Sequence, residues 1–139
     1  MLLLIRFLNQ SLIEKKQTSG VINMNWNELS ELDTLNQINE ISKNKPVLIF
    51  KHSTRCSISA ASLNRLERKW NTDKAQNLEA YFLDLIANRD ISNAIAEKYG
   101  VDHQSPQILL IQNGECVYDN SHFGISFDEV IDNIKPIAA

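Results

Sequence analysis

A change of hydrophobic pattern on either side of Cys56 most constrains what this chain can fold into. Before it, residues 47–50 (Val-Leu-Ile-Phe) form a continuous apolar run of strand-forming residues, which is typical of a buried central strand. After it, Leu63, Leu66 and Trp70 recur at helical spacing among charged residues, which predicts an amphipathic helix over residues 57–70. We therefore expect Cys56 where a central strand ends and a helix begins.

The rest of the chain also alternates between strand and helix patterns. In order, we expect a short strand near Trp26, a helix through Leu35, Ile38 and Ile41 capped by Asp33, a strand over 78–86, a helix over 91–99 ended by Gly100, strands over 107–112 and 115–119, and a last helix opened by a Ser126–Glu129 capping box. Asn113-Gly114 predicts a tight hairpin between the last two strands, since both central residues of such a turn need positive φ.

This order of elements predicts the fold class. The first strand–helix–strand unit should be parallel and the hairpin must be antiparallel, so the sheet is mixed and helices cover both faces. The order β-α-β-α-β-β-α, preceded by an N-terminal helix, is that of an α/β thioredoxin-like fold. We assign this domain to residues 24–139. Residues 1–23 show no periodic pattern and are predicted to be a loosely ordered N-terminal extension, with Met24 as a hypothetical second start.

Composition and charge exclude several classes of function. Fourteen basic and seventeen acidic residues give a net charge of −3, which argues against nucleic-acid binding by phosphate neutralisation. No apolar run approaches the ~20 residues of a membrane-spanning helix. The two cysteines and three scattered histidines have no metal-ligand spacing. We expect no metal, no tightly bound cofactor, and neither a nucleic-acid nor a membrane partner.

Cys56 is the predicted catalytic residue. The first backbone N–H groups of a helix are unpaired and carry partial positive charge, so a sulfur placed there is stabilised as the thiolate. Arg55, with Lys51 and His52 nearby, adds positive potential. The thiolate is the nucleophilic form of cysteine, which favours a reactive role. The alternative is an inert, half-buried cysteine, because free cysteine is among the most buried residue types.

The residues after Cys56 restrict the chemistry to one thiol. Ser57 opens the predicted helix, and Ser59 stands where a two-thiol redox motif has its second cysteine. A serine cannot attack and release a mixed disulfide, so a second thiol molecule must do so. We expect the Ser59 hydroxyl to hydrogen-bond the Cys56 sulfur and stabilise its anion.

Two later positions complete the predicted site. In a thioredoxin-like order, the proline that opens the third core strand is typically cis and faces the catalytic cysteine, so we predict a cis bond between Ser105 and Pro106. Ser105 would then offer its backbone groups to an extended substrate. Cys116 is expected on a central strand as a small buried hydrophobe, with a resolving role as the alternative.

Residues 45–59 (KPVLIFKHSTRCSIS) resemble the signature of the YtxJ-type monothiol bacilliredoxins. Residues 105–107 (Ser-Pro-Gln) and 121–123 (Ser-His-Phe) resemble later blocks of that family, and the resemblance spans about residues 25–135. It implies a cytoplasmic thiol–disulfide oxidoreductase that uses bacillithiol, a low-molecular-weight thiol, as co-substrate. Cys56 takes the place of the family's cysteine and Pro106 that of its cis-proline. The implied activity is removal of bacillithiol from S-bacillithiolated client proteins.

Two other functions are compatible with the pattern. One is an iron–sulfur carrier resembling monothiol glutaredoxins, with Cys56 and an external thiol as ligands, although Ser57-Ile58 stands where those proteins have a glycine-phenylalanine step. The other is a thioredoxin-like binding module in which Cys56 is silent.

Overall fold

The computed structural model describes residues 24–136, so the predicted extension over residues 1–23 lies outside the described residues. The elements, in chain order, are β1 (Trp26–Glu28), α2 (Leu32–Ile41), β2 (Val47–His52), α3 (Ser57–Lys69), β3 (Glu79–Asp84), α4 (Arg89–Tyr99), β4 (Gln107–Gln112), β5 (Glu115–Ser121), the short 3-10 helix η1 (His122–Gly124) and α5 (Phe127–Asp132). Strands and helices alternate as the hydrophobic pattern predicts.

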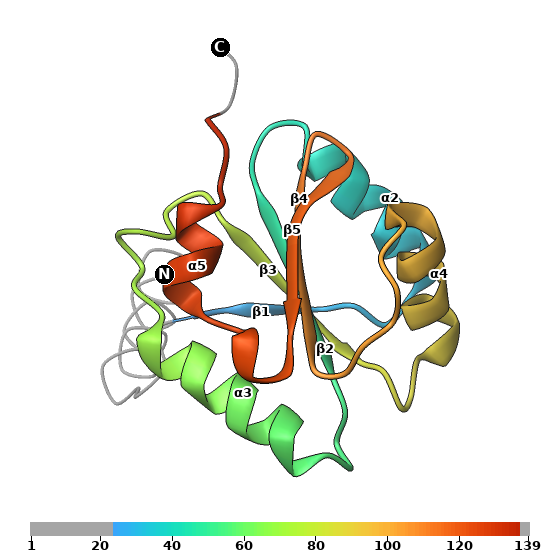
Figure 1. The fold of residues 1–139 in the computed structure, drawn as a ribbon. Coiled ribbons are helices and arrows are strands. Elements are labelled where there is room, and N and C mark those ends of the chain that lie inside the picture. The colour runs from blue at the N-terminus through green and yellow to red at the C-terminus, as the bar shows by residue number, and fades with distance from the viewer. Residues whose placement is uncertain (1–23, 137–139) are drawn as a thin grey trace, which may run out of the picture.

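The strands form one mixed sheet with β2 at its centre. Their order is β1-β3-β2-β4-β5, with β3 parallel to both β1 and β2, and with β4 antiparallel to both β2 and β5. Helices α2 and α4 lie on one side of this sheet and α3 and α5 on the other (Figure 1). The predicted α/β class and mixed sheet are therefore confirmed.

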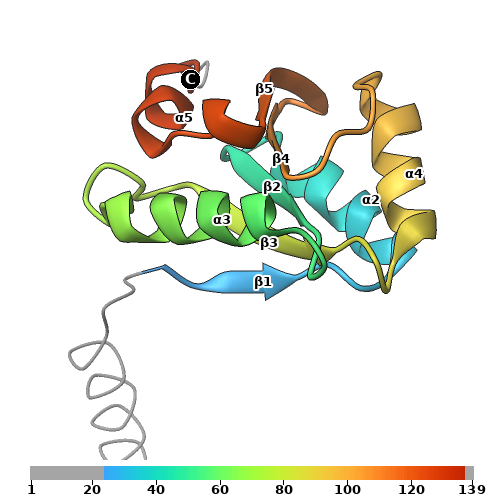
Figure 2. The ribbon, with the colours of Figure 1, turned by 60° about the horizontal axis from the view of Figure 1, so that its bottom comes forward.

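Alternation of side chains along β2 explains why the sheet has a core on each face. Val47 and Ile49 belong to a buried cluster with residues of α2 and α4, whereas Leu48 and Phe50 belong to a second cluster with residues of α3 and α5. All four side chains have 0% exposure. Figure 2 shows the two helical layers from another direction. The central strand is thus held rigidly from both sides, which fixes the direction in which its carboxyl end leaves the sheet.

The three residues predicted to adopt positive φ are also confirmed. Asn113 and Gly114 have φ values of 55° and 76°, as the tight turn between β4 and β5 requires. Gly100 closes α4 with φ of 65°.

The predicted Asp33 cap and the predicted capping box are wrong, although Ser126 is the N-cap residue of α5 as expected. Helix α2 begins earlier than expected, with Glu31 as its N-cap, so Asp33 falls within the first turn. Ser126 does precede α5 but makes no capping hydrogen bond. The Glu129 carboxylate instead accepts a hydrogen bond from the Tyr118 hydroxyl at 2.8 Å, so it is turned toward β5.

Two strand assignments differ from expectation. The polar Lys51 and His52 do not end β2 but continue it, because Lys51 pairs with Gln107 on β4 and His52 with Asp84 on β3. Cys116 lies on β5, which is an edge strand and not a central one. Pairing with distant segments decides where β2 ends and that β5 is an edge strand. The local hydrophobic pattern carries no information on this pairing.

Candidate active site

Cys56 is the N-cap residue of α3, in an extended conformation. Its N–H donates to the carbonyl of Ser53 at 3.2 Å, which closes the turn after β2. The backbone N–H groups of Ser57, Ile58 and Ser59 donate to no acceptor among the described residues. They surround the start of the helix with partial positive charge, as unpaired amides there do. Cys56 is only partly buried, and it belongs to neither hydrophobic cluster. Cys56 therefore lies at the unpaired start of a helix and outside both hydrophobic cores.

The Ser59 side chain is bound to β2 and not to the sulfur. Its hydroxyl accepts the Ser53 N–H at 3.0 Å and lies 2.7 Å from Nδ1 of His52. Burial lowers the pKa of His52, and the carboxylates of Asp84 and Glu67 oppose the shift only in part. A hydrogen bond therefore joins the Ser59 hydroxyl to Nδ1 of His52. This differs from the expected hydrogen bond to Cys56, because the buried serine has a nearer acceptor.

The basic residues near Cys56 in the sequence differ in their exposure to solvent. Arg55 is exposed and forms no ion pair with any described residue. Lys51 has 0% exposure and lies on the opposite face of the sheet, toward α4. The expected positive potential at the cysteine thus comes from Arg55 at the surface and from the helix amides, whereas Lys51 acts from within the fold.

The bond between Ser105 and Pro106 is cis, as predicted. Because Gln107 pairs with Lys51, Pro106 begins β4 opposite the end of β2. Its carbonyl accepts the N–H of His122 at 3.0 Å, and the carbonyl of His122 accepts the hydroxyl of Ser62 on α3 at 3.0 Å. This chain of hydrogen bonds places the proline beside the helix that Cys56 opens.

Ser105 has free hydrogen-bonding groups. Neither its N–H nor its C=O is bonded to another residue of the described segment 24–136. Its hydroxyl oxygen is buried and also lacks a partner there. Free backbone N–H and C=O groups are the groups with which an added strand pairs.

Sequence reasoning found no role for the segment after β5, which forms part of the same surface. His122 adopts φ of 54°, and η1 follows it directly. The Phe123 side chain is 76% exposed, and its carbonyl accepts a hydrogen bond from Arg65 on α3 at 3.5 Å. Gly124 is required here because a Cβ would overlap the side-chain amide of Asn120. The glycine leaves room for the close approach of the Asn120 side chain, and the unusual backbone angle in this segment belongs to His122.

The second cysteine has a different environment. Cys116 packs against the cluster under α2 and α4, and its thiol donates to the carbonyl of Tyr118 at 3.3 Å. Burial, with the Asp119 carboxylate, raises the pKa of the Cys116 thiol to about 11. Both cysteines are free. The expected role as a small hydrophobe fits this position, although on an edge strand.

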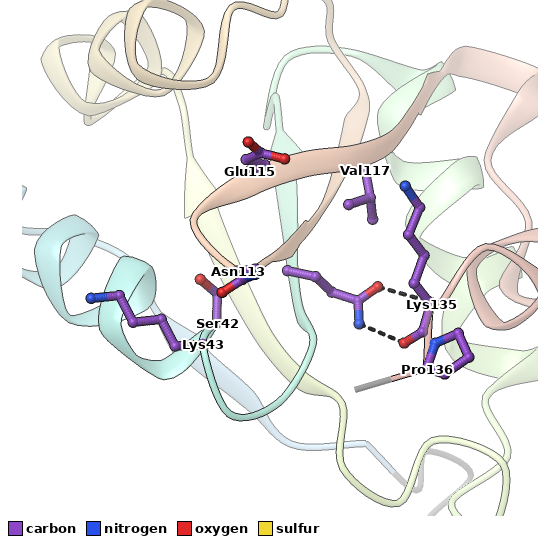
Figure 3. Close-up of a pocket in the computed structure, with 8 residues that line it drawn as sticks. Ser42, Lys43, Asn113, Glu115, Val117, Lys135 and Pro136 are labelled. Carbon is purple, nitrogen blue, oxygen red and sulfur yellow. Dashed lines mark hydrogen bonds between the residues drawn. The ribbon is translucent and has the colours of Figure 1, made fainter. Parts of the chain in front are cut away.

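A cavity of about 290 Å³ lies at the opposite end of the sheet from Cys56, beside the β4–β5 turn (Figure 3). Two hydrogen bonds between the Gln112 side-chain amide and the backbone of Lys135, at 2.9 and 2.8 Å, hold the C-terminal segment across it. These hydrogen bonds have a structural role and bring no catalytic group near the Cys56 thiol.

Within residues 24–136, no three His, Cys, Asp or Glu side chains converge as metal ligands would. No helix of that segment combines the length and the apolar character needed to cross a bilayer.

Comparison with known proteins agrees with this geometry. Residues 27–130 match the model of a family described as monothiol bacilliredoxin BrxC. A solved structure described as a candidate oxidoreductase with a thioredoxin fold is 33% identical, with a TM-score of 0.65, over 76% of this chain and 90% of that one.

Thioredoxins share the fold at much lower identity. That of Malassezia sympodialis is 15% identical with a TM-score of 0.62, over 78% of this chain and 87% of that one. Mitochondrial thioredoxin 3 of Saccharomyces cerevisiae is 14% identical with a TM-score of 0.60, over 78% and 95%. The predicted thioredoxin-like fold is confirmed.

Proposed function

Because the chain belongs to the monothiol bacilliredoxin family, whose members are thiol–disulfide oxidoreductases, we propose that Cys56 removes bacillithiol from S-bacillithiolated client proteins. The family membership predicted from residues 45–59 is confirmed by the match over residues 27–130. The observation that carries the proposal is the placement of a partly exposed cysteine at the N-cap of α3, with serine and not cysteine at position 59.

The proposed reaction has two exchange steps. The Cys56 thiolate attacks the bacillithiol sulfur of the mixed disulfide, so a Cys56–bacillithiol disulfide forms and the client–bacillithiol disulfide breaks. The client cysteine leaves as a thiolate and takes a proton from water. A second low-molecular-weight thiol then attacks the bacillithiol sulfur on Cys56 and releases Cys56 as the thiolate. The buried Ser59 hydroxyl cannot replace that second thiol, because it forms no disulfide.

The docking of the client is supported by the surface beside Cys56. The free N–H and C=O of Ser105 suit an extended segment that pairs with them, and the exposed Phe123 ring offers an apolar contact. We assign Arg55 to the charged rim of this surface and Ser57 to the amides that face the sulfur. We place the reaction in the cytoplasm, where cysteines are kept reduced.

The test follows the bacillithiol group by intact mass. Reduced protein is mixed with a synthetic peptide whose single cysteine is disulfide-bonded to bacillithiol, and in parallel with oxidised glutathione. The wild type should gain one bacillithiol and release the peptide thiol. Cys56→Ser should gain none while keeping its fold, and Cys116→Ser should behave like the wild type.

Other results would contradict the proposal. Transfer by Cys56→Ser at the wild-type rate would remove Cys56 from the reaction. An adduct with glutathione but none with bacillithiol would show that the thiol is different. Cluster absorption in the visible spectrum of anaerobically purified protein, with no transfer, would favour the iron–sulfur carrier.

A further inference from the structure

Lys51 is a buried lysine without a carboxylate partner. Its side chain has 0% exposure, at the carboxyl end of β2 and on the face covered by α4. No carboxylate oxygen of residues 24–136 lies within ion-pair distance of its Nζ. Burial lowers the pKa of Lys51 to about 8, so the amine is still mostly charged near pH 7. A buried charge without a partner lowers the free energy of unfolding. Stability therefore does not explain why a lysine occupies this position.

The ammonium joins α4 to the loop that leads into Pro106. Nζ donates to the carbonyl of Ser92 at 3.2 Å and lies 3.5 Å from Nδ1 of His103. The Ser92 hydroxyl also reaches that nitrogen, at 3.2 Å. Burial lowers the pKa of His103, and the positive charges of Lys51 and Arg89 lower it further. An ammonium only donates, so Nδ1 of His103 is the acceptor for Lys51, and the Ser92 hydroxyl lies beside the same nitrogen.

A second buried side chain anchors the same loop. Gln107 pairs with Lys51 across the β2–β4 ladder and is 1% exposed. Its amide nitrogen donates to the carbonyl of Asp102 at 2.9 Å, and its amide oxygen accepts the N–H of Gln104 at 3.4 Å. Residues 102–104 are therefore fastened to the ends of β2 and β4, immediately before the free backbone groups of Ser105.

We propose that Lys51 is a positioning residue for client recognition, which acts through His103 to hold the loop over residues 101–106 where Ser105 pairs with an extended polypeptide. The inference rests on the proposed function, because it assigns the peptide-binding half of that reaction. A pre-ordered loop spares an incoming chain the entropy of ordering it, so its effect is on binding. A disulfide of two small thiols makes no strand pairing and should not sense Lys51.

The experiment compares two substrates by single-turnover formation of the Cys56–bacillithiol adduct. One is the bacillithiolated synthetic peptide, and the other is oxidised bacillithiol. For Lys51→Met, the half-saturating peptide concentration should rise about tenfold with a limiting rate within about twofold of wild type. The rate with oxidised bacillithiol should not change. The melting temperature should be equal or higher, since a buried charge has been removed.

Matched variants separate positioning from general damage. Lys45→Met removes an equal charge from a surface ion pair with Glu79 and should leave both substrates unaffected. His103→Leu should reproduce the Lys51→Met effect on the peptide, whereas His103→Asn keeps an acceptor and should restore most of the peptide binding. The His103 pair decides the question if Lys51→Met does not fold.

The outcomes distinguish this inference from the proposed function. An unchanged half-saturating peptide concentration in Lys51→Met and His103→Leu would overturn the inference while leaving the function intact. An equal loss of rate on both substrates would also overturn it, because it would assign Lys51 to the chemistry of the thiol. A wild-type protein that acts on neither substrate would overturn the proposed function itself.

Discussion

At the scale of single residues, Ser59 has a structural role at a position where two-thiol redox motifs have a catalytic cysteine. It occupies the place of a second cysteine three residues after Cys56, yet its hydroxyl joins His52 to the Ser53 N–H. The serine therefore holds the turn between β2 and α3 in shape. Its chemical contribution is the absence of a second thiol, which leaves the mixed disulfide on Cys56 for an external thiol to resolve.

This task predicts a cost in stability for Ser59→Ala. The variant leaves the buried Ser53 N–H without an acceptor and the His52 nitrogen without a donor, so the free energy of unfolding should fall by about 1–3 kcal/mol. Urea unfolding measures it. Ser57→Ala, an exposed serine in the same turn, should change that free energy by less than about 0.5 kcal/mol. Equal losses in both variants would contradict the account.

At the scale of elements, the site depends on η1, which connects β5 to the start of the last helix. It is held against α3 by the Ser62 hydroxyl and by Arg65, and it holds Pro106 through the N–H of His122. Helix α3 thus positions Cys56 by its N-terminus and the cis-proline through η1. The cysteine and the docking surface move as one unit if α3 moves.

Gly124→Ala tests this coupling. The new methyl group would overlap Asn120, whose side chain bonds the Ser121 N–H at 2.8 Å and the Tyr118 hydroxyl at 3.1 Å. We expect a loss of about 1–3 kcal/mol in unfolding free energy. Relative to wild type, adduct formation with the bacillithiolated peptide should slow more than adduct formation with oxidised bacillithiol.

Gly100→Ala is the control for that variant. It meets no atom within 4 Å and strains only a backbone at φ of 65°, so it should lower stability by about 1 kcal/mol. It should leave the ratio of the two adduct-formation rates unchanged. A peptide rate for Gly124→Ala that is as fast as wild type would separate η1 from the docking surface.

At the scale of the whole molecule, the two faces of the sheet serve different purposes. The face under α3 and α5 carries the cluster that holds the Cys56 helix, and the face under α2 and α4 carries both Cys116 and the buried Lys51. The loop before Pro106 crosses from the second face to the first. Titratable groups on the second face therefore couple global stability to pH without touching the nucleophile.

Cys116 makes that coupling measurable at alkaline pH. Its pKa is raised from the ordinary 9.0 to about 11, so above pH 9 the unfolded chain loses the thiol proton while the folded chain retains it. At this site the unfolded state then binds fewer protons, so the contribution of Cys116 to stability falls as pH rises from 9 to 11. We expect a loss of roughly 1–2 kcal/mol, which is less than the whole shift would give because the thiol is partly exposed to solvent.

Cys116→Ser should lack this component. Urea denaturation from pH 8 to 11 measures the unfolding free energy of both proteins. As pH rises, the wild type should lose stability relative to Cys116→Ser. Lys51 titrates alike in both proteins and cancels in the difference between them, because burial alone shifts its pKa. Besides burial, the Cys116 thiolate also raises the pKa of Tyr99, so the variant removes that coupling as part of the same alkaline component. A difference that is constant with pH would mean that the Cys116 thiol is not shielded as its packing indicates.

The sequence by itself determined the kinds and order of the elements, the cis-proline position and the single-thiol character of the site. The elements and the single thiol follow from local quantities: the apolar run Val47–Phe50, the helical period over Leu63–Trp70, the turn chemistry of Asn113-Gly114, and the serine at position 59. The cis-proline position follows from the thioredoxin-like order that these elements make, and not from the dipeptide itself. The resemblance of residues 45–59 to the family added the thiol, which no periodicity contains.

Only the tertiary structure decided which polar side chains became structural. Lys51 and His52 look like a polar end to β2, but pairing with β3 and β4 extends the strand through them and turns one to each face of the sheet. Ser59 then meets His52, and Lys51 meets His103. These contacts join residues far apart in the chain or on opposite sides of a turn, and their geometry depends on how the whole sheet closes, so no local pattern encodes them.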